Sequence, residues 1–287
     1  MKITEIISGK SPSLSFEIFP PKNTTALESV RRAAWEISRL SPSFMSVTYG
    51  AGGTTANFTL EIADMVENEY NVTALAHLTC LTSCKDTIKE RLGKLRERGI
   101  ENILALRGDR PQEMSEIKGE YRYASELVAD IKEYGGFCIG GACYPEGHPE
   151  SARQRDDIMN LKIKADAGCE FFTTQMFFDN NILYNFMYKI REAGIKVPVI
   201  AGIMPVTNGA QIKRICSMSG TMLPTRFIQI VDRYSDNPTA MIQAGIAYAT
   251  EQIIDLFANG INAVHIYSMN KPEVASSIAK NISEIIK

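Results

Sequence analysis

Leu104-Ala-Leu-Arg-Gly-Asp109 is the stretch of sequence that indicates the fold most directly. Its apolar half predicts a buried parallel strand, and it ends abruptly in a cation, a glycine and a carboxylate. In a barrel of parallel strands, side chains just past the carboxyl end of a strand face the active site. A carboxylate in such a position is explained better by chemistry than by stability, because an isolated buried charge is costly. We therefore expect Arg107, Gly108 and Asp109 to lie at a functional site.

Strand-like apolar runs of this kind recur along the chain and alternate with amphipathic helical patterns. Regular alternation of strand and helix implies a parallel sheet, and eight such units in 287 residues imply a closed (β/α)8 TIM barrel of the α/β class. We expect a single domain, residues 1–287, with a short extra helix in the irregular segment 217–237. A doubly wound open sheet is the alternative. The predicted strands are Leu14–Phe19, Phe44–Val47, Thr73–Leu78, Asn102–Leu106, Cys138–Tyr144, Phe171–Met176, Val199–Ile203 and Ala263–Tyr267.

Composition and charge argue against several classes of protein. The hydrophobic fraction of 45% is that of an ordinary globular chain, and the net charge of −2 leaves no basic surface for nucleic acid. No apolar run approaches the ~18 residues that span a membrane, and the N-terminus lacks the apolar core of a secretory signal. We therefore expect a soluble, cytoplasmic protein. His77-x-x-Cys80-x-x-x-Cys84 supplies three possible metal ligands without a fourth, so no metal site is predicted.

The first predicted strand places a carboxylate near the mouth of the barrel. Its even positions, Leu14, Phe16 and Ile18, form an apolar face suited to packing under the outer helices, so the odd positions point into the barrel. Glu17 is the last odd position before Pro20-Pro21 ends the strand. Partial burial there should raise its pKa, as a general acid requires. The alternative is a structural ion pair with an inward lysine or arginine.

Other strands also end in polar groups, which favours a binding site at one rim of the barrel. Neither a G-x-G-x-x-G motif nor a P-loop is present, so a nucleotide would be held along the rim by side chains and helix N-termini. Asp157, Asn160 and Lys164 follow at i, i+3 and i+7 and share one helical face. That face predicts either a cofactor contact or an ordinary solvated surface. The polar groups at the strand ends are His77, His148, Gln175 and Lys271, and the Gly50-Ala-Gly-Gly53 turn after the second strand lets a ligand approach the backbone closely.

A series of short motifs, taken in order, resembles the pattern of one enzyme family. They cover nearly the whole chain. The chain resembles the methylenetetrahydrofolate reductases of the bacterial type, which consist of the catalytic barrel only. The motifs are Ser15-Phe-Glu-Ile-Phe-Pro-Pro21, Ser46-Val-Thr-Tyr-Gly-Ala51, Leu106-Arg-Gly-Asp109, Tyr144-Pro-Glu-x-His-Pro-Glu150, Lys164-x-Asp-Ala-Gly168, Thr174-Gln-x-Phe-Phe-Asp179, Gly202-Ile-Met-Pro205 and His265-x-Tyr-x-x-Asn270.

The resemblance implies an FAD-containing oxidoreductase that acts on a CH–NH group in one-carbon metabolism and methionine biosynthesis. NADH or NADPH reduces the flavin and leaves, and 5,10-methylenetetrahydrofolate then accepts the hydride to give 5-methyltetrahydrofolate. Glu17 matches the general acid that protonates the departing N10 of the folate. Asp109 matches a carboxylate beside flavin and pterin, which would stabilise the resulting 5-iminium cation.

The resemblance also implies two sets of binding residues. The residues matched to folate binding are Gln175, Gln211 and Lys271. The residues matched to FAD binding are Thr48, Tyr49, Ala51, His77, Arg107, Gly108, Asp109, Ala124, Tyr144, His148, Asp157, Asn160 and Lys164.

Three positions depart from the family's pattern. Ile163 stands where many bacterial members carry a second cation, Ile215 where an aromatic side chain often stacks on nicotinamide or folate, and Lys271 where an arginine is usual. The altered stacking position leaves open a flavin and folate subunit of a larger complex that takes electrons from a partner protein instead of NAD(P)H. A folate- or flavin-binding barrel without turnover is a second alternative, against which Glu17 and Asp109 argue. The resemblance further implies a homo-oligomer, and no control by adenosylmethionine is expected.

Overall fold

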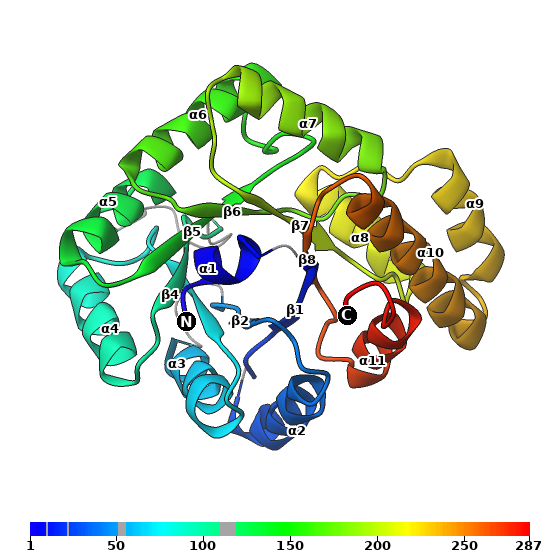
Figure 1. Ribbon diagram of the computed structural model, residues 1–287, viewed down its shortest axis with the longest axis horizontal. Helices are drawn as coiled ribbons and strands as arrows, with labels where there is room; N and C mark the ends of the chain where they lie inside the picture. The colour runs from blue at the N-terminus through cyan, green and yellow to red at the C-terminus, as the bar shows by residue number, and fades with distance from the viewer. Residues whose placement is uncertain (10, 22, 51–55, 110–118) are drawn as a thin grey trace.

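The strands of the chain form one closed parallel barrel (Figure 1). A computed structural model describes all residues except 10, 22, 51–55 and 110–118. Each strand pairs with the next in the sequence, and β8 closes the ring on β1. All strands lie close to their predicted bounds, so the (β/α)8 prediction is confirmed and the open sheet is excluded. The strands are β1 (Ser13–Ile18), β2 (Met45–Val47), β3 (Ala74–Thr79), β4 (Asn102–Leu106), β5 (Cys138–Cys143), β6 (Phe171–Thr174), β7 (Val199–Ile203) and β8 (Ala263–Ile266).

The main helices pack around the barrel and complete the alternating pattern (Figure 1). A 3-10 turn, η1 (Thr24–Ala26), precedes α2, and a π-helical turn, η3 (Met65–Glu69), extends α3. The expected extra helix is confirmed as α9 (Thr225–Tyr234), which packs with α8 and α10 at the right of Figure 1. The surrounding helices are α2 (Leu27–Ser38), α3 (Ala56–Asp64), α4 (Lys85–Glu97), α5 (Ala124–Tyr134), α6 (Gln154–Ala167), α7 (Asn180–Glu192), α8 (Gly209–Ser219), α10 (Pro238–Ala258) and α11 (Pro272–Asn281).

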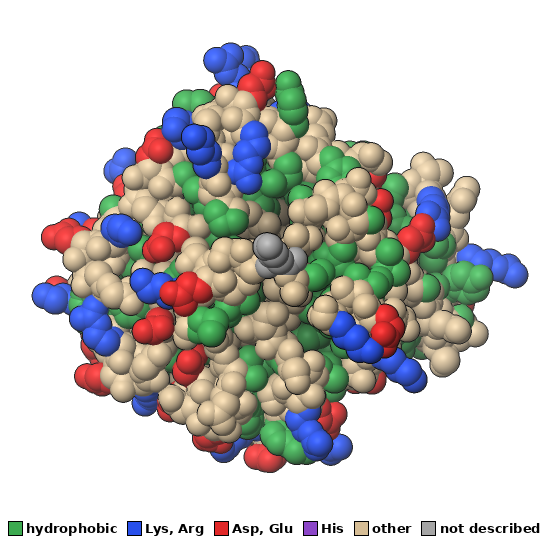
Figure 2. Space-filling view, viewed as in Figure 1, with side chains coloured by type: hydrophobic (Ala, Val, Ile, Leu, Met, Phe, Trp, Pro, Cys, Tyr) green, Lys and Arg blue, Asp and Glu red, His purple; other side chains and the backbone are tan. Residues whose placement is uncertain are grey.

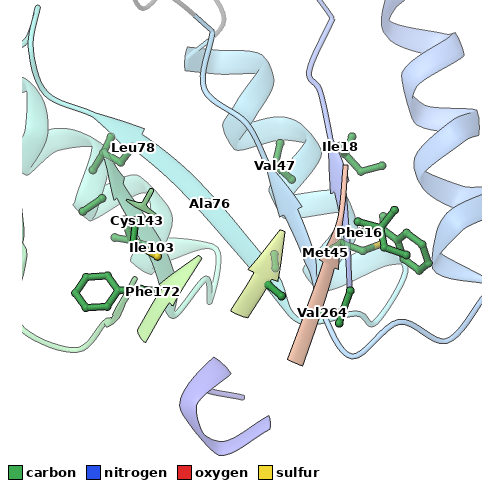
Figure 3. Close-up of a cluster of buried hydrophobic side chains, with 14 of the residues drawn as sticks. Phe16, Ile18, Met45, Val47, Ala76, Leu78, Ile103, Cys143, Phe172 and Val264 are labelled. Atoms are coloured by element: carbon green, nitrogen blue, oxygen red, sulfur yellow. The ribbon is translucent and has the colours of Figure 1, made fainter. Parts of the chain in front are cut away.

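The apolar core lies between the wall of the barrel and the helices. Figure 3 shows part of this layer, with Phe16 and Ile18 of β1 near Met45 and Val47 of β2. The predicted alternation along β1 is confirmed, because its even positions belong to this core. The odd positions are buried as well but face the interior of the barrel, which leaves their polar groups available to one another and to a ligand.

The amino ends of the strands are closed by a short helix, α1 (Ile3–Ile7), seen over the centre of the barrel in Figure 1. Ile3 packs in an apolar cluster with inward-facing side chains of the strands. Asn102, fully buried on β4, ties this helix to the wall. Its Oδ1 accepts from the Ile3 N–H at 2.9 Å, and its Nδ2 donates to the carbonyls of Met1 at 3.0 Å and Ala74 at 3.3 Å. This end is therefore filled by protein, and Figure 2 shows the same face with its charged side chains mostly around the edge. The carboxyl ends of the strands are left for ligands.

Replacing Asn102 by alanine should destabilise the protein strongly. The change removes three hydrogen bonds and leaves the buried Ile3 N–H without its partner. An unsatisfied buried group costs roughly 1–3 kcal/mol, so we expect to lose about 3 kcal/mol of unfolding free energy, or roughly 6–12 °C in Tm. A thermal scan measures this, with the exposed Asn181→Ala as control. An unchanged Tm for Asn102→Ala would show that the α1 contact adds nothing to stability.

Candidate active site

Glu17 lies at the carboxyl end of β1 with its side chain buried inside the barrel. Only 6% of the residue is exposed, and burial raises the pKa of its carboxyl group to about 8. The group is therefore protonated and neutral near pH 7, as expected for a general acid. Among the residues that the structure describes, no lysine or arginine forms an ion pair with it. The structural ion pair considered as an alternative therefore has no support in this part of the chain.

His77 on β3 lies near Glu17 without bonding to it. Its Nε2 is 3.9 Å from Glu17 Oε2, beyond hydrogen-bonding distance. Burial lowers the pKa of His77 to about 3, so both groups are neutral at pH 7 and the contact is no salt bridge. His77 Nε2 is buried and has no hydrogen-bond partner among the residues that the structure describes. A buried nitrogen left unpaired beside a neutral acid is typical of a site where a ligand supplies the partner.

A hydrogen-bonded layer below Glu17 fixes the strands that carry it. Ser15 Oγ donates to the Val264 carbonyl at 3.0 Å and lies 2.8 Å from His265 Nδ1. Because the hydroxyl proton of Ser15 is used, its oxygen accepts from Nδ1–H, and Ser46 Oγ donates to Nε2 of His265 at 2.9 Å. Burial lowers the pKa of His265 to about 3, so the ring stays neutral in this tautomer. Strands β1, β2 and β8 are thereby linked beneath the acid.

Asn270, which follows β8, holds the end of β1 in place. Its Oδ1 accepts from the Phe19 N–H at 2.8 Å, and its Nδ2 donates to the Phe19 carbonyl at 2.8 Å. Asn270 (φ 55°) and Met269 (φ 56°) adopt a left-handed backbone conformation that is uncommon outside glycine. Asn270 belongs to a motif quoted above, but no role was predicted for it. The sequence signal for such a role is an asparagine in a turn, because asparagine tolerates the left-handed backbone conformation.

A large cavity opens at the same end of the barrel. Its volume is about 1100 Å³, and it runs from the ends of β4 and β5 to the helices α5 and α6. Pockets for drug-sized ligands measure about 300–1,000 Å³, so this cavity suits a larger molecule of dinucleotide size. Most of the residues predicted to bind FAD come together in its wall. They are Tyr49, Arg107, Gly108, Asp109, Ala124, Tyr144, His148, Asp157, Asn160 and Lys164.

Thr48 and His77, which were also predicted to bind FAD, are not among the residues that line this wall. Thr48 follows β2, where its carbonyl accepts from Thr59 Oγ1 at 2.9 Å. His77 lines, together with Tyr49, a separate cavity of about 180 Å³ between α3 and α4. Ala51 lies outside the described residues. The large cavity is thus built mainly from two strand ends and two helices.

Several charged groups of the large cavity are held by contacts within the protein. Arg107 forms a two-point ion pair with Glu150, Nη1 to Oε2 at 2.6 Å and Nη2 to Oε1 at 2.7 Å. Lys164 donates to the carbonyl of Ala142, and burial lowers the pKa of its amino group. Burial also raises the pKa of Asp157. Glu150 was not predicted as a site residue, although it ends one of the quoted motifs. Perturbed charges of this kind cluster at functional sites.

The residues present fit a flavin nucleotide. Tyr144 and His148 meet edge to face with ring centroids 4.6 Å apart, and the buried hydroxyl of Tyr49 has no partner within the described residues. Helix α5 begins at Ala124 in the cavity wall, so the positive end of its dipole lies at the cavity, where Glu126 Oε2 caps the N–H groups of Arg122 and Tyr123. Aromatic surface, an unpaired polar atom and a helix N-terminus are the groups that a flavin ring and its phosphates require.

The residues predicted to bind folate lie toward β6, β7 and β8. Gln175 follows β6, and its side chain accepts from the Met176 N–H at 3.0 Å. Gln211 is exposed in the first turn of α8, and Lys271 Nζ donates to Thr207 Oγ1 at 2.7 Å. None of the three lines the large cavity. The barrel mouth therefore offers two regions, one built from β4 and β5 and one from the last three strands.

The two isoleucines that depart from the family's pattern have different surroundings. Ile163 lines the large cavity with 54% of its surface exposed, so an apolar side chain occupies this part of the wall. Ile215 packs against a buried cluster that includes Ile212 and Phe227 of the α8–α9 region. The first substitution therefore changes the surface that a ligand meets, whereas the second takes part in packing.

Within the described part of the chain, no group of three or more histidine, cysteine or acidic side chains is arranged to hold a metal ion. Nor does any helix found there combine the length and the apolar surface that crossing a bilayer requires. All six cysteines are free, and Cys84 is the exposed one.

Comparison with known protein families and sequences gives a consistent result. The family model described as methylenetetrahydrofolate reductase matches residues 2–283. The chain is 34% identical over 300 residues to methylenetetrahydrofolate reductase (NADH) 1 of Zea mays, a match that covers 99% of this chain and 50% of that protein. It is 33% identical over 270 residues to 5,10-methylenetetrahydrofolate reductase of Escherichia coli (strain K12), covering 94% of this chain and 90% of that protein. The chain thus spans about half the length of the plant relative.

A solved structure with the same fold comes from Clostridium thermocellum. That uncharacterized protein binds two copies of 5-methyl-5,6,7,8-tetrahydrofolic acid. The two folds agree with a TM-score of 0.67 at 15% sequence identity, and the match covers 98% of each chain. At this level of identity the similarity establishes the barrel fold alone.

Proposed function

The chain belongs to the methylenetetrahydrofolate reductase family, and we propose that it reduces 5,10-methylenetetrahydrofolate to 5-methyltetrahydrofolate with hydride from NADH or NADPH passed through FAD. The observation that carries this proposal is the neutral, buried carboxyl group of Glu17 at the barrel mouth. A cavity of dinucleotide size opens at the same end of the barrel. Binding alone gives no reason to bury an acid in its protonated form, whereas proton transfer to a substrate does.

Glu17 donates its proton to N10 of the folate in this proposal. Loss of the C–N10 bond opens the five-membered ring and leaves a 5-iminium cation, which is ready to accept hydride. A carboxyl group with a pKa of about 8 holds its proton before the reaction at neutral pH and is still acidic enough to release it. Asp109, a carboxylate at the end of β4, stabilises the cation. His77 and His265 stay neutral, so neither places a positive charge near Glu17 that would favour its early ionisation.

The large cavity holds FAD in this proposal, and the last three strands hold the folate. The cations Arg107 and Lys164 and the N-terminus of α5 belong to the wall around the FAD, and Tyr144 and His148 supply aromatic surface for the flavin. When bound, FAD supplies a two-electron carrier that accepts hydride from the nicotinamide and passes it to the folate. The side chains that hold the folate are Gln175, Gln211 and Lys271.

The rate of folate reduction should fall at high pH. Burial raises the pKa of Glu17 to about 8, so the acid is in its active, protonated form below that pH and loses the proton above it. We expect a plateau from pH 6 to about 7.5 and a tenfold loss for each pH unit well above 8, about 10²-fold by pH 10. Stopped-flow measurement of flavin reoxidation by methylenetetrahydrofolate gives this profile. The reduction of flavin by NADH, which needs no general acid, should lack the alkaline limb; the same limb in both steps would assign it to another group.

An anaerobic titration of the FAD-loaded protein with NADH tests the proposed route. Bleaching of the oxidised-flavin absorbance, reversed by methylenetetrahydrofolate, would establish transfer from nicotinamide to folate. A flavin that stays oxidised under NADH and NADPH, yet is reduced by methyltetrahydrofolate, would support the alternative in which a partner protein supplies the electrons. Failure to bind FAD would contradict both. We further expect a homo-oligomer that acts in the cytoplasm.

A further inference from the structure

The wall of the large cavity carries more negative than positive groups among its described residues. Its cations are Arg107, Arg122 and Lys164, and its carboxylates are Asp109, Glu150, Asp156 and Asp157. FAD, the cofactor of the proposed function, brings further negative charge with its diphosphate. The cations that can reach the phosphates therefore decide how tightly the cofactor binds.

Two of the three cations already have acceptors within the protein. Both terminal nitrogens of Arg107 bond Glu150, at 2.6 and 2.7 Å, and its Nε donates to the Gly108 carbonyl at 3.3 Å. Lys164 donates to the Ala142 carbonyl. The one histidine in the wall, His148, adds no positive charge at neutral pH, because burial lowers its pKa.

Arg122 is in a different situation. It lines the cavity two residues before α5 begins at Ala124, and its side chain is exposed to the cavity and solvent. Its guanidinium group makes no hydrogen bond or ion pair with any residue that the structure describes, whereas its backbone N–H donates to Glu126 Oε2 at 2.6 Å. The backbone is thus fixed beside the positive end of the α5 dipole, and the charged group has no acceptor among the described residues.

We propose that Arg122 binds a phosphate of FAD. Of the cations that line the described part of the cavity, it is the one whose charged group has no acceptor among the described residues. A guanidinium group matches the oxygens of a phosphate with two parallel N–H donors. Its position beside the α5 N-terminus adds the helix dipole to the same contact. The inference rests on the proposed FAD site and assigns it a residue that the resemblance did not supply.

Binding of two flavins to apoprotein tests this, with the quenching of flavin fluorescence as the readout. Arg122→Gln should bind FAD roughly fivefold to tenfold more weakly, the range for a charge-assisted contact at a partly exposed site. Its affinity for riboflavin, which has no phosphate, should be unchanged. The dependence of FAD affinity on salt should become shallower, because one screened ion contact is lost. Arg155→Gln, an exposed arginine on α6 that does not line the cavity, is the matched control.

A second, independent test moves the positive charge to another position in the wall of the cavity. Ile163 lines the same cavity with an exposed apolar side chain, so Ile163→Arg in the Arg122→Gln background should restore part of the FAD affinity. Equal affinity of Arg122→Gln and parent for FAD, with the same salt dependence, would overturn the inference alone. Equal weakening of FAD and riboflavin would also overturn it, because the loss would not come from a phosphate. A parent protein that binds riboflavin but not FAD, or neither flavin, would overturn the proposed function itself.

Discussion

Glu17→Gln should lower the rate of folate reduction by about 10³-fold and leave the reduction of bound flavin by NADH nearly unchanged, since a positioned general acid contributes roughly 10²–10⁴-fold. Glutamine keeps the size and polarity of a protonated glutamic acid but has no acidic proton to give to N10. Because burial holds the pKa of Glu17 at about 8, the parent side chain is neutral at pH 7 and the replacement does not change the charge of the site. Stopped-flow kinetics separates the two steps as flavin bleaching by NADH and flavin reoxidation by methylenetetrahydrofolate.

The stability of the same variant provides a second readout that needs no ligand. The pKa of Glu17 is about 8 in the folded protein against an ordinary 4.5, so the folded state keeps a proton that the unfolded state has lost. The unfolding free energy of the parent therefore falls as the pH rises from about 4.5 to about 8, and glutamine removes this fall. Above pH 8 the variant should have the higher Tm.

A matched control for both readouts is Glu170→Gln, a carboxylate just before β6 at the amino ends of the strands. It should leave folate turnover unchanged. Full folate turnover in Glu17→Gln would mean that another group supplies the proton, and the general-acid role would then be wrong.

The barrel could be predicted because each strand carries its own local signal. In β1 the alternation of Leu14, Phe16 and Ile18 with polar residues indicates which face packs under the helices, whatever the neighbouring strands are. The raised pKa of Glu17 follows from the same pattern, because burial alone is sufficient to cause it. The spacing of Asp157, Asn160 and Lys164 likewise predicts that they share one face of α6, and all three line the large cavity.

Contacts between distant parts of the chain could not be predicted in this way. Arg107 pairs with Glu150, 43 residues further along, and Asn270 holds Phe19, 251 residues earlier. Local periodicity reports which face of an element is apolar, whereas these pairs depend on where the loops of different strands meet. Arg122 illustrates the same limit, since its significance comes from acceptors that occupy the other cations of the wall.

Asp109→Asn should slow folate reduction by about 10²-fold. Asp109 is exposed at the end of β4, and ligands packed against it would exclude the water that screens its charge. Opposite charges about 5 Å apart at an effective dielectric constant of about 20 interact by ~3 kcal/mol, which corresponds to that change in rate if the interaction is made with the iminium cation. Asparagine keeps the shape of the side chain and removes the charge, so the substitution isolates the electrostatic contribution.

The two half-reactions distinguish this role from a role in holding the cofactor. A carboxylate that stabilises the folate cation acts in the second step, so reduction of flavin by NADH should be affected much less. Asp109→Asn should also shift the midpoint potential of the bound flavin to a more positive value, because a nearby negative charge disfavours reduction of the flavin. Asp166→Asn, on the exposed part of α6 where the parent residue pairs with Lys162 at 3.4 Å, controls for a general change in charge. Equal losses in both steps together with a lower flavin content would assign Asp109 to cofactor binding, since a carboxylate that acts on the folate cation has no means of weakening the first step.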